Sequence, residues 1–278
     1  LLPAFIAFLL FKYYPMAQAF NMSLYEYSIV RPPGEFVGLQ NFVDVFDEPR
    51  VWRAAGNTVQ LLVTGLLLTF WVPIVFAILI NEVKQFQGVF RVLYFIPAVA
   101  PPVVMAVLWK NIWQPDFGIA NYVLQSLGLG TQLWLNDPDL AKIALKLPEI
   151  WLSGLNLLIF LAALQDIPEE FYEAATVDGA SLLQKLRFVT LPFLRPTILV
   201  VLILAVIAGL QEFAVPFVMT QGGPAGTTTT ISMYIYNRAF RDGDYGFAMA
   251  VAILFFLVIM LITYVQLRLS REQEAEEA

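Results

Sequence analysis

Long apolar stretches separated by short polar segments make up most of the chain. Four of these stretches carry no charged residue, namely Ala54–Asn81, Val92–Trp109, Pro196–Gln211 and Tyr245–Gln266. Because a bilayer core of roughly 30 Å is crossed by about 20 apolar helical residues, each stretch predicts a membrane-spanning helix.

Two further stretches bring the predicted count to six. Ile150–Gln165 is shorter, but residues 139–149 can extend its helix outwards. Leu1–Phe20 is apolar from its first residue and lacks an initiator Met, so we expect the true N-terminus to be missing. A secretory signal is the alternative for this segment, although it has no basic leading region and no clear small-residue cleavage site. The predicted fold class is an all-α membrane protein with six transmembrane helices.

Six spans place both chain ends on one side of the membrane. The predicted layout is a first transmembrane helix at 1–20, an extracytoplasmic loop at 21–53, a core of five helices at 54–268 that contains an inner loop at 166–195, and an acidic cytoplasmic tail at 269–278. The segments placed inside hold seven Lys or Arg residues in 52 positions, and those placed outside hold eight in 106. Since cytoplasmic loops are enriched in basic residues, both termini are predicted to be cytoplasmic.

The composition excludes several classes of function. Charged residues make up 14% of the chain and apolar residues 59%, whereas a soluble domain carries roughly 25% charged residues. The chain has no Cys and no His, which removes thiolate nucleophiles and the commonest metal ligand and general base. A net charge of −6 argues against nucleic-acid binding. We expect no catalytic residue and no metal site on this chain.

The inner loop predicts two short helices joined at a sharp corner. Asp166 with Glu169 forms a capping-box pattern that predicts a first helix over Ile167–Val177, and Gly179 supplies its stop. Ser181 and Gln184 form a second capping box, and the second helix is expected to end before Pro192. The two helices favour either a docking knob for a cytoplasmic partner or a connection that lies on the membrane surface.

One string in this loop resembles a known family. Glu173, Ala174 and Ala175 are followed after Thr, Val and Asp178 by Gly179, and the pair Leu191-Pro192 follows about a dozen residues later. This pattern is similar to the "EAA" coupling motif of the permeases of ABC importers. The resemblance implies a type I ABC importer permease fold, in which these seven residues form the contact with an ATPase subunit.

Other matches point to the carbohydrate branch of that family. Residues 38–42, Asn57-Thr58 and the run Thr220–Pro224 resemble maltose-permease F-type subunits. The large outer-loop insertion of some maltose permeases is absent, so the chain is closer to the smaller sugar or glycerol-phosphate permeases.

The resemblance implies an importer that carries a sugar or oligosaccharide by alternating access in a bacterial or archaeal plasma (inner) membrane. The implied partners are a second permease subunit, two ATPase subunits and an extracytoplasmic solute-binding protein, besides membrane lipid and the sugar itself. No lysine of the chain follows a glycine, so it carries no phosphate-binding Gly-Lys motif. The chain is expected to bind no cofactor, and ATP and Mg belong to the partner ATPase subunits.

Polar residues on two predicted spans are candidates for substrate contact, since such residues usually line a cavity. They are Glu149, Trp151, Ser153, Asn156, Gln211 and Glu212. The alternative is helix–helix hydrogen bonding, or an interfacial position for the two carboxylates. Three prolines in the third span, Pro97, Pro101 and Pro102, predict a broken helix that either borders the transport path or is a tolerated kink.

Two other classes of function compete with the importer. An ion-coupled secondary transporter of a small polar solute would use an intramembrane carboxylate such as Glu212 and no ATPase. An intramembrane enzyme would need an Asp pair or a Ser–Lys dyad, and the spans contain neither. The coupling motif and an expected lack of other buried charges weigh against the secondary transporter.

Overall fold

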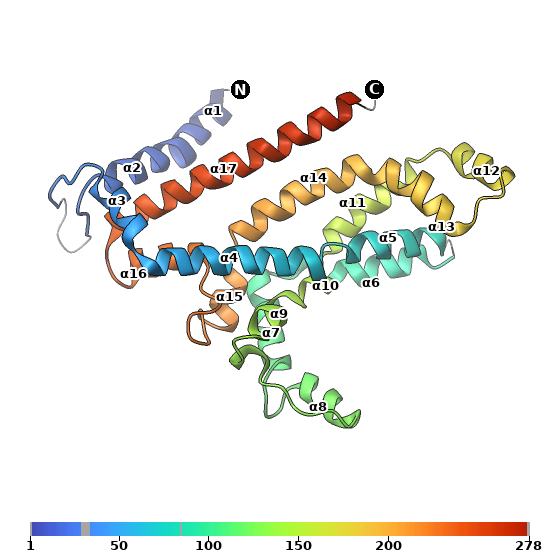
Figure 1. The fold of residues 1–278 in the computed structure, drawn as a ribbon, viewed down its shortest axis with the longest axis horizontal. Helices are drawn as coiled ribbons and strands as arrows, with labels where there is room; N and C mark the ends of the chain where they lie inside the picture. The colour runs from blue at the N-terminus through green and yellow to red at the C-terminus, as the bar shows by residue number, and fades with distance from the viewer. Residues whose placement is uncertain (1, 29–33, 84, 277–278) are drawn as a thin grey trace.

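The computed structural model describes residues 2–28, 34–83 and 85–276, with side chains described as far as residue 270. Over these ranges every regular element is helical, and an isolated antiparallel β bridge joins Tyr25 and Phe36. The molecule is elongated, and most of its long helices run roughly along its long axis (Figure 1).

The N-terminal half begins with α1 (Leu2–Phe8) and α2 (Tyr14–Ser23), which are joined by a π-helical turn at Leu9–Tyr13. The helices that follow are α3 (Gln40–Asp47), α4 (Pro49–Leu68), α5 (Val72–Glu82), α6 (Gln87–Val99), α7 (Pro102–Ile112) and α8 (Ile119–Ser126).

The C-terminal half continues the helical pattern. Its helices are α9 (Ala141–Lys146), α10 (Glu149–Leu152), α11 (Gly154–Gln165), α12 (Glu169–Val177), α13 (Leu182–Lys185), α14 (Leu191–Leu210), α15 (Ala214–Met219), α16 (Ile231–Phe240) and α17 (Tyr245–Glu276). The side chains of the predicted acidic tail beyond residue 270 lie outside the described part of the structure.

Three helical segments of the described chain are long and apolar enough to cross a membrane, namely Pro49–Glu82, Leu182–Met219 and Tyr245–Ser270. Two bent pairs, α6 with α7 and α9–α10 with α11, raise this number to five if each pair forms one span. Residues 2–23 are helical but do not belong to this set, so the predicted count of six is not confirmed.

The broken helix that the prolines predict within Val92–Trp109 is confirmed, because α6 and α7 meet at an angle of 97°. The break lies at Ala100 and Pro101, whose ψ angles of 142° and 134° are not helical. A residue that precedes proline is pushed out of the helical region, and the consecutive prolines Pro101 and Pro102 also lack backbone donors. Pro97 lies within α6 and does not end it.

The first helix of the inner loop begins later than predicted. Asp166 caps the C-terminus of α11, donating its N–H to Ala162, and α12 begins at Glu169 without a side-chain cap. The capping box predicted for Asp166 and Glu169 is therefore wrong. The intervening Pro168 has a ψ of 133°, so the chain turns between the two residues instead of continuing as one N-cap.

The helix that contains Pro192 also differs from the prediction. It does not end before this proline but continues from α13 through a π-helical turn at Leu186–Thr190 into α14. A π turn shifts the hydrogen-bond ladder by one residue, and Pro192 then falls in the first turn of α14, where a missing N–H costs little.

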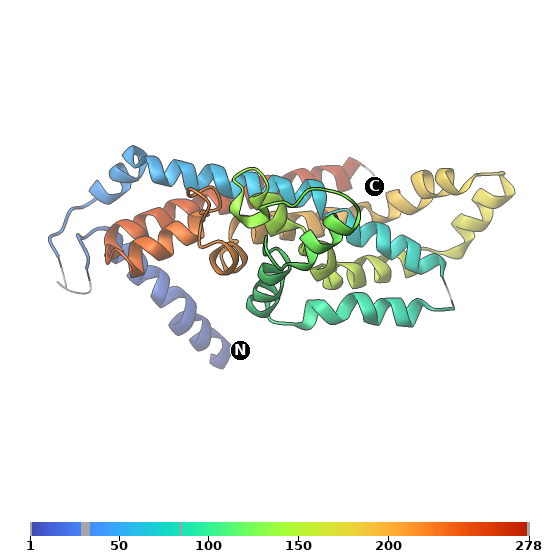
Figure 2. The same cartoon turned by 90° about the horizontal axis from the view of Figure 1, so that it is seen from below.

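The core forms where α11 packs against α5, α6 and α14. Its central side chains are fully or almost fully buried, including Ala77, Leu157, Phe160, Leu161 and Leu194. A second cluster joins α3, α4, α16 and α17. Large apolar residues remain exposed along α1, α6 and α17, as expected for surfaces that face lipid or another membrane subunit. Figure 2 shows that the N-terminal end at α1 diverges from the bundle, whereas α2 packs against α17.

Candidate transport cavity and coupling arm

A cavity of about 330 Å³ lies between α4, the start of α5, the α10–α11 bend and the C-terminal half of α14. Its polar wall consists of Thr69, Lys146, Glu149, Ser153, Asn156 and Glu212. The remaining lining residues are apolar or glycine. A cavity with a few convergent polar groups is the usual form of a site for a small ligand.

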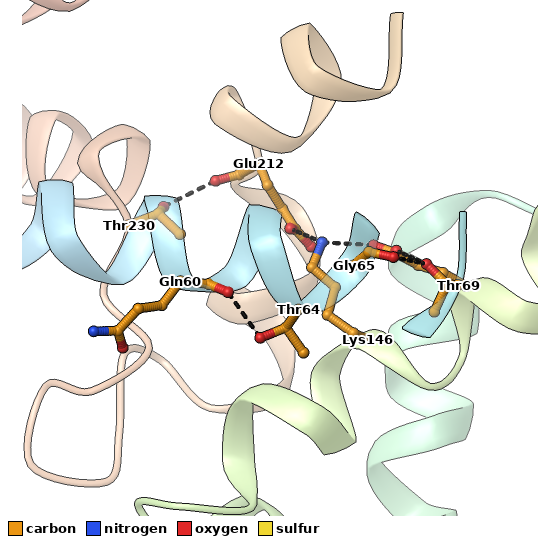
Figure 3. A network of polar contacts seen from close by, with 8 residues as sticks. Gln60, Thr64, Gly65, Thr69, Lys146, Glu212 and Thr230 are labelled. Atoms are coloured by element: carbon orange, nitrogen blue, oxygen red, sulfur yellow. Dashed lines mark hydrogen bonds and ion pairs between the residues drawn. The ribbon is translucent and has the colours of Figure 1, made fainter. Parts of the chain in front are cut away.

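A charged cluster occupies one end of this cavity. The Lys146 ammonium lies 2.7 Å from Oε1 of Glu149 and also contacts the carboxylate of Glu212. The side chain of Lys146 is 3% exposed, whereas those of Glu149 and Glu212 are 36% and 11% exposed. Figure 3 shows Lys146 between Glu212 on one side and, on the other, Gly65 of α4 and Thr69, which directly follows that helix.

Hydrogen bonds from α4 and α16 hold both carboxylate residues in place. The Thr69 hydroxyl donates to Oε2 of Glu149 at 2.9 Å. The Thr230 hydroxyl donates to the backbone carbonyl of Glu212 at 2.8 Å. Because a buried charge without partners is costly, these contacts fix the geometry of the cluster.

Two glycines allow the cavity walls to approach each other. A Cβ atom at Gly65 would lie 3.3 Å from Oε2 of Glu149 and 3.4 Å from Cδ of Lys146. A Cβ atom at Gly209 would lie 2.7 Å from Cδ1 of Leu62. The absence of a side chain at Gly65 therefore lets α4 pack directly against the charged cluster.

The structure brings together four of the six predicted substrate residues. Glu149, Ser153, Asn156 and Glu212 line the cavity, whereas Trp151 and Gln211 are exposed outside it. Ser153 also makes a 3.0 Å hydrogen bond with the Tyr94 hydroxyl, which supports the alternative of helix–helix bonding for this residue.

Sequence reasoning missed Lys146 and placed it among the basic residues of an outer loop. The expected lack of other buried charges is wrong, because Lys146 is buried between two carboxylates. Its spacing of three residues from Glu149 is a helical ion-pair signal that could have indicated the pair. The partner Glu212 is 66 residues away, and nothing in the sequence links it to Lys146.

The charged cluster lies at the end of the cavity that is farther from α12 and α13. Helix α14 runs from the α12–α13 end of the molecule towards Glu212, and α11 runs in the opposite direction from the cavity to α12 (Figure 1). Asn156 therefore lies deeper along the path from the cluster to α12 than Glu149 does.

The α12–α13 segment forms a rigid corner, which we call the coupling arm (residues 169–190). Gly179 has a φ of +75°, donates to the carbonyl of Thr176 at 3.0 Å, and is followed by a 2.9 Å bond from Ala180 to Ala175. These two bonds form the Schellman motif that ends helices at a left-handed residue. The predicted helix stop at Gly179 is confirmed.

The second capping box of the arm is also confirmed. The Ser181 hydroxyl accepts from the backbone N–H of Gln184, and the Gln184 side chain accepts from the backbone N–H of Ser181 at 2.7 Å. Contacts between the two sides of the arm add to its rigidity. Lys185 donates to the Thr176 hydroxyl at 2.7 Å, and the hydroxyls of Tyr172 and Thr190 lie 3.0 Å apart.

The tip of the arm exposes large apolar side chains. Val177 is 88% exposed, and Leu182 and Leu183 are exposed to a similar degree. Of the predicted coupling residues, Glu173, Ala174, Asp178 and Gly179 are exposed and Ala175 is half-buried on the arm, whereas Leu191 and Pro192 lie at the start of α14. In both ribbon views the arm lies at one end of the molecule, beside the end of α5 and the start of α6 (Figures 1 and 2).

This architecture agrees with a family that the sequence itself identifies. Residues 70–272 match the family described as "Binding-protein-dependent transport system inner membrane component". The chain belongs to this family. The coupling arm and the cavity residues from Phe70 onwards fall within the matched residues, whereas the cavity residues at 62–69 precede them.

Two relatives of this permease align over nearly its whole length. It is 34% identical to the trehalose/maltose transport system permease protein of Thermococcus litoralis, over 98% of this chain and 92% of the relative. It is 35% identical to the sulfoquinovosyl glycerol transport system permease protein of Agrobacterium fabrum, over 99% of this chain and 90% of the relative.

Solved structures show the same fold. A bacterial ABC transporter involved in the import of the acidic polysaccharide alginate has a chain that superposes with a TM-score of 0.87 at 30% identity, over 98% of this permease and 93% of that chain. The alginate transporter is also known in complex with a periplasmic protein that carries an alginate pentasaccharide, with the same TM-score and identity. The permease is therefore a membrane-embedded transport subunit with the type I ABC importer fold.

Proposed function

We propose that this permease is the transmembrane subunit of an ATP-driven, binding-protein-dependent importer that moves a sugar or oligosaccharide into the cytoplasm by alternating access. The observation that carries the proposal is the combination of a polar cavity inside the bundle with an exposed apolar arm at one end. The relatives named for sugar transport support the substrate class. In this scheme Glu149, Ser153, Asn156 and Glu212 contact the sugar.

The coupling arm is the proposed contact with an ATPase subunit. Its apolar tip at Val177, Leu182 and Leu183 would be buried in a cleft of that subunit, which supplies the hydrophobic free energy for docking. Because capping and cross-arm hydrogen bonds make the arm rigid, it transmits movement of the ATPase subunits through the π turn into α14. Helix α14 forms one wall of the cavity, so the same movement reaches the site.

The remaining subunits follow from the type of importer. Two ATPase subunits bind ATP and Mg, a second permease subunit completes the membrane domain, and an extracytoplasmic binding protein delivers the sugar. The periplasmic protein bound to the solved alginate transporter supports the last of these partners. This permease binds no cofactor of its own in the scheme.

The proposed placement is a bacterial or archaeal plasma membrane, with both termini and the coupling arm in the cytoplasm. This arrangement requires an even number of spans. In the proposal there are six, with residues 1–20 as the first and residues 54–268 as the core of five helices. The charged cluster then lies at the extracytoplasmic end of the cavity.

Reconstitution of the intact complex tests the function. The complex is purified in mild detergent, reconstituted with its binding protein, and assayed for ATPase activity against a panel of sugars. We expect one group of sugars to stimulate ATP hydrolysis and to enter vesicles only with ATP. Uptake that follows an ion gradient without ATP would support the secondary transporter instead.

A further inference from the structure

The charged cluster of the cavity exposes one of its two negative groups, Glu149, and conceals its positive one. Lys146 is the only basic residue in the cavity lining, and its side chain is 3% exposed. The Glu149 side chain is 36% exposed and faces the same cavity. With Glu212 included, the lining holds one positive and two negative groups, so its formal charge is −1 when all three are ionised.

The Lys146 ammonium is hydrogen-bonded to both neighbouring carboxylates. It donates to Oε1 of Glu149 at 2.7 Å and to the carboxylate of Glu212. Turning this ammonium towards an anionic ligand would leave Glu212 buried without its counter-ion, which is strongly unfavourable. Lys146 is therefore an internal counter-ion and not a receptor for a carboxylate or sulfonate.

The rest of the polar wall suits hydroxyl groups. An ionised carboxylate accepts hydrogen bonds at about four lone-pair positions, and Glu149 uses one bond from Lys146 and one from Thr69. Asn156 offers a donor and an acceptor farther along the cavity. Sugar hydroxyls can donate to the free acceptor positions, whereas a ligand carboxylate would face two like charges without a free cation.

We infer that the cavity admits uncharged saccharides and excludes acidic ones, with Glu149 and Glu212 as the residues that reject negative charge. This inference rests on the proposed function. It separates the permease from the alginate and sulfoquinovosyl glycerol transporters, whose named substrates are acidic, and groups it with relatives named for neutral sugars such as trehalose and maltose.

The charge of the cavity can be measured without knowing the substrate. The chain contains no cysteine, so an Ala208→Cys variant places one thiol on the cavity wall, and Ser126→Cys places one on the exposed end of α8 as a control. The intact complex in detergent is treated with a cationic or an anionic methanethiosulfonate, and modification of this chain is followed by mass spectrometry. We expect the cationic-to-anionic rate ratio to be at least tenfold higher for Ala208→Cys than for Ser126→Cys.

Adding Glu149→Gln and Glu212→Gln to the Ala208→Cys variant should lower that ratio at least tenfold, because Lys146 is then the only charged residue of the cavity lining. Equal ratios at the two cysteine positions would overturn the inference. An unchanged rate ratio after the double substitution would overturn the inference as well, because the preference for the cationic reagent would then require another source of negative charge.

A transport assay provides a second, independent test of the inference. Vesicles with the full importer are offered a neutral oligosaccharide and its counterpart oxidised to the uronic acid at C6, across a panel of sugars. Uptake of neutral members alone supports the inference, and ATP-driven uptake of an acidic member contradicts it while the proposed function stands. If no saccharide stimulates an intact complex, the proposed function fails and the inference falls with it, whatever the reagent ratio.

Discussion

The Thr69 hydroxyl donates a hydrogen bond of 2.9 Å to Oε2 of Glu149, and this contact joins the end of α4 to the start of α10. Thr69 is buried, and its backbone N–H donates to the Gly65 carbonyl one turn earlier at 2.8 Å. Through these two contacts Thr69 connects the C-terminal end of α4 to the charged cluster of the cavity.

Thr69→Val should destabilise the permease, because valine keeps the shape but leaves Oε2 of Glu149 without its donor. A hydrogen bond to a charged group contributes about 1.5–3 kcal/mol to stability, and the 36% exposure of the Glu149 side chain places the expected loss at the lower end of this range. The matched control is Thr64→Val, whose hydroxyl bonds only to the Gln60 carbonyl of its own helix and is exposed. Thermal unfolding in detergent compares the two variants, and equal midpoints would contradict the role given to Thr69.

Gly65→Val should disturb the cavity more than the same change at another glycine of α4. At Gly65 even a Cβ atom meets Glu149 and Lys146 within 3.4 Å, whereas Gly56 has nothing within 4 Å. We expect Gly65→Val to reduce sugar-stimulated ATPase activity at least fivefold and Gly56→Val to leave it within twofold. A Gly65→Val complex with normal stimulation would show that close packing at the cluster is dispensable.

Gly179→Val should abolish docking of the ATPase, because a β-branched residue strongly disfavours the φ of +75° found there. Asn tolerates left-handed conformations, so Gly179→Asn is the conservative control and should retain most of the activity. Co-purification of the ATPase subunit is the measurement. Retention of the ATPase by both variants would mean that the corner does not need its left-handed residue.

Val177→Ser should weaken the association with the ATPase without affecting the fold of the permease, since this side chain is 88% exposed. Burying one aliphatic side chain at an interface contributes on the order of 1.5 kcal/mol, which corresponds to about a tenfold loss of affinity. Phe117→Ser changes another strongly exposed apolar residue, 74% exposed, in the segment between α7 and α8 and should leave the ATPase bound. Equal effects of the two substitutions would contradict a docking role for the arm.

Local signals in the sequence predicted local structure well where no proline intervened. Ser181 with Gln184 and the stop at Gly179 involve bonds within five residues, so the sequence pattern determines them. The pair Asp166–Glu169 has the same spacing as Ser181–Gln184, but Pro168 turns the chain between its members and the box does not form. Pro192 was expected to end a helix, and a π turn before it lets the helix continue.

The candidate site was only partly predictable, because its geometry depends on contacts between distant segments. Polar residues at the predicted spans pointed to Glu149, Ser153, Asn156 and Glu212, which line the cavity, and their contact with a substrate stays a prediction. Which face of a short bent helix turns inward depends on the 47° bend between α10 and α11, so the exposure of Trp151 could not be read from the sequence. The pairing of Lys146 with Glu212 arises only when the connection between α14 and α15 meets the end of α9, against which α15 packs.

The most direct test of the account asks whether the cavity is the transport path. Ala208→Trp would fill the cavity from α14, and Val200→Trp on the same helix lies at an exposed position outside the lining. ATP-driven uptake of the stimulating sugar is measured in vesicles that contain equal amounts of assembled complex. We expect at least a tenfold loss of uptake for Ala208→Trp and uptake within twofold of the unmodified complex for Val200→Trp. Normal uptake by the Ala208→Trp complex would contradict it.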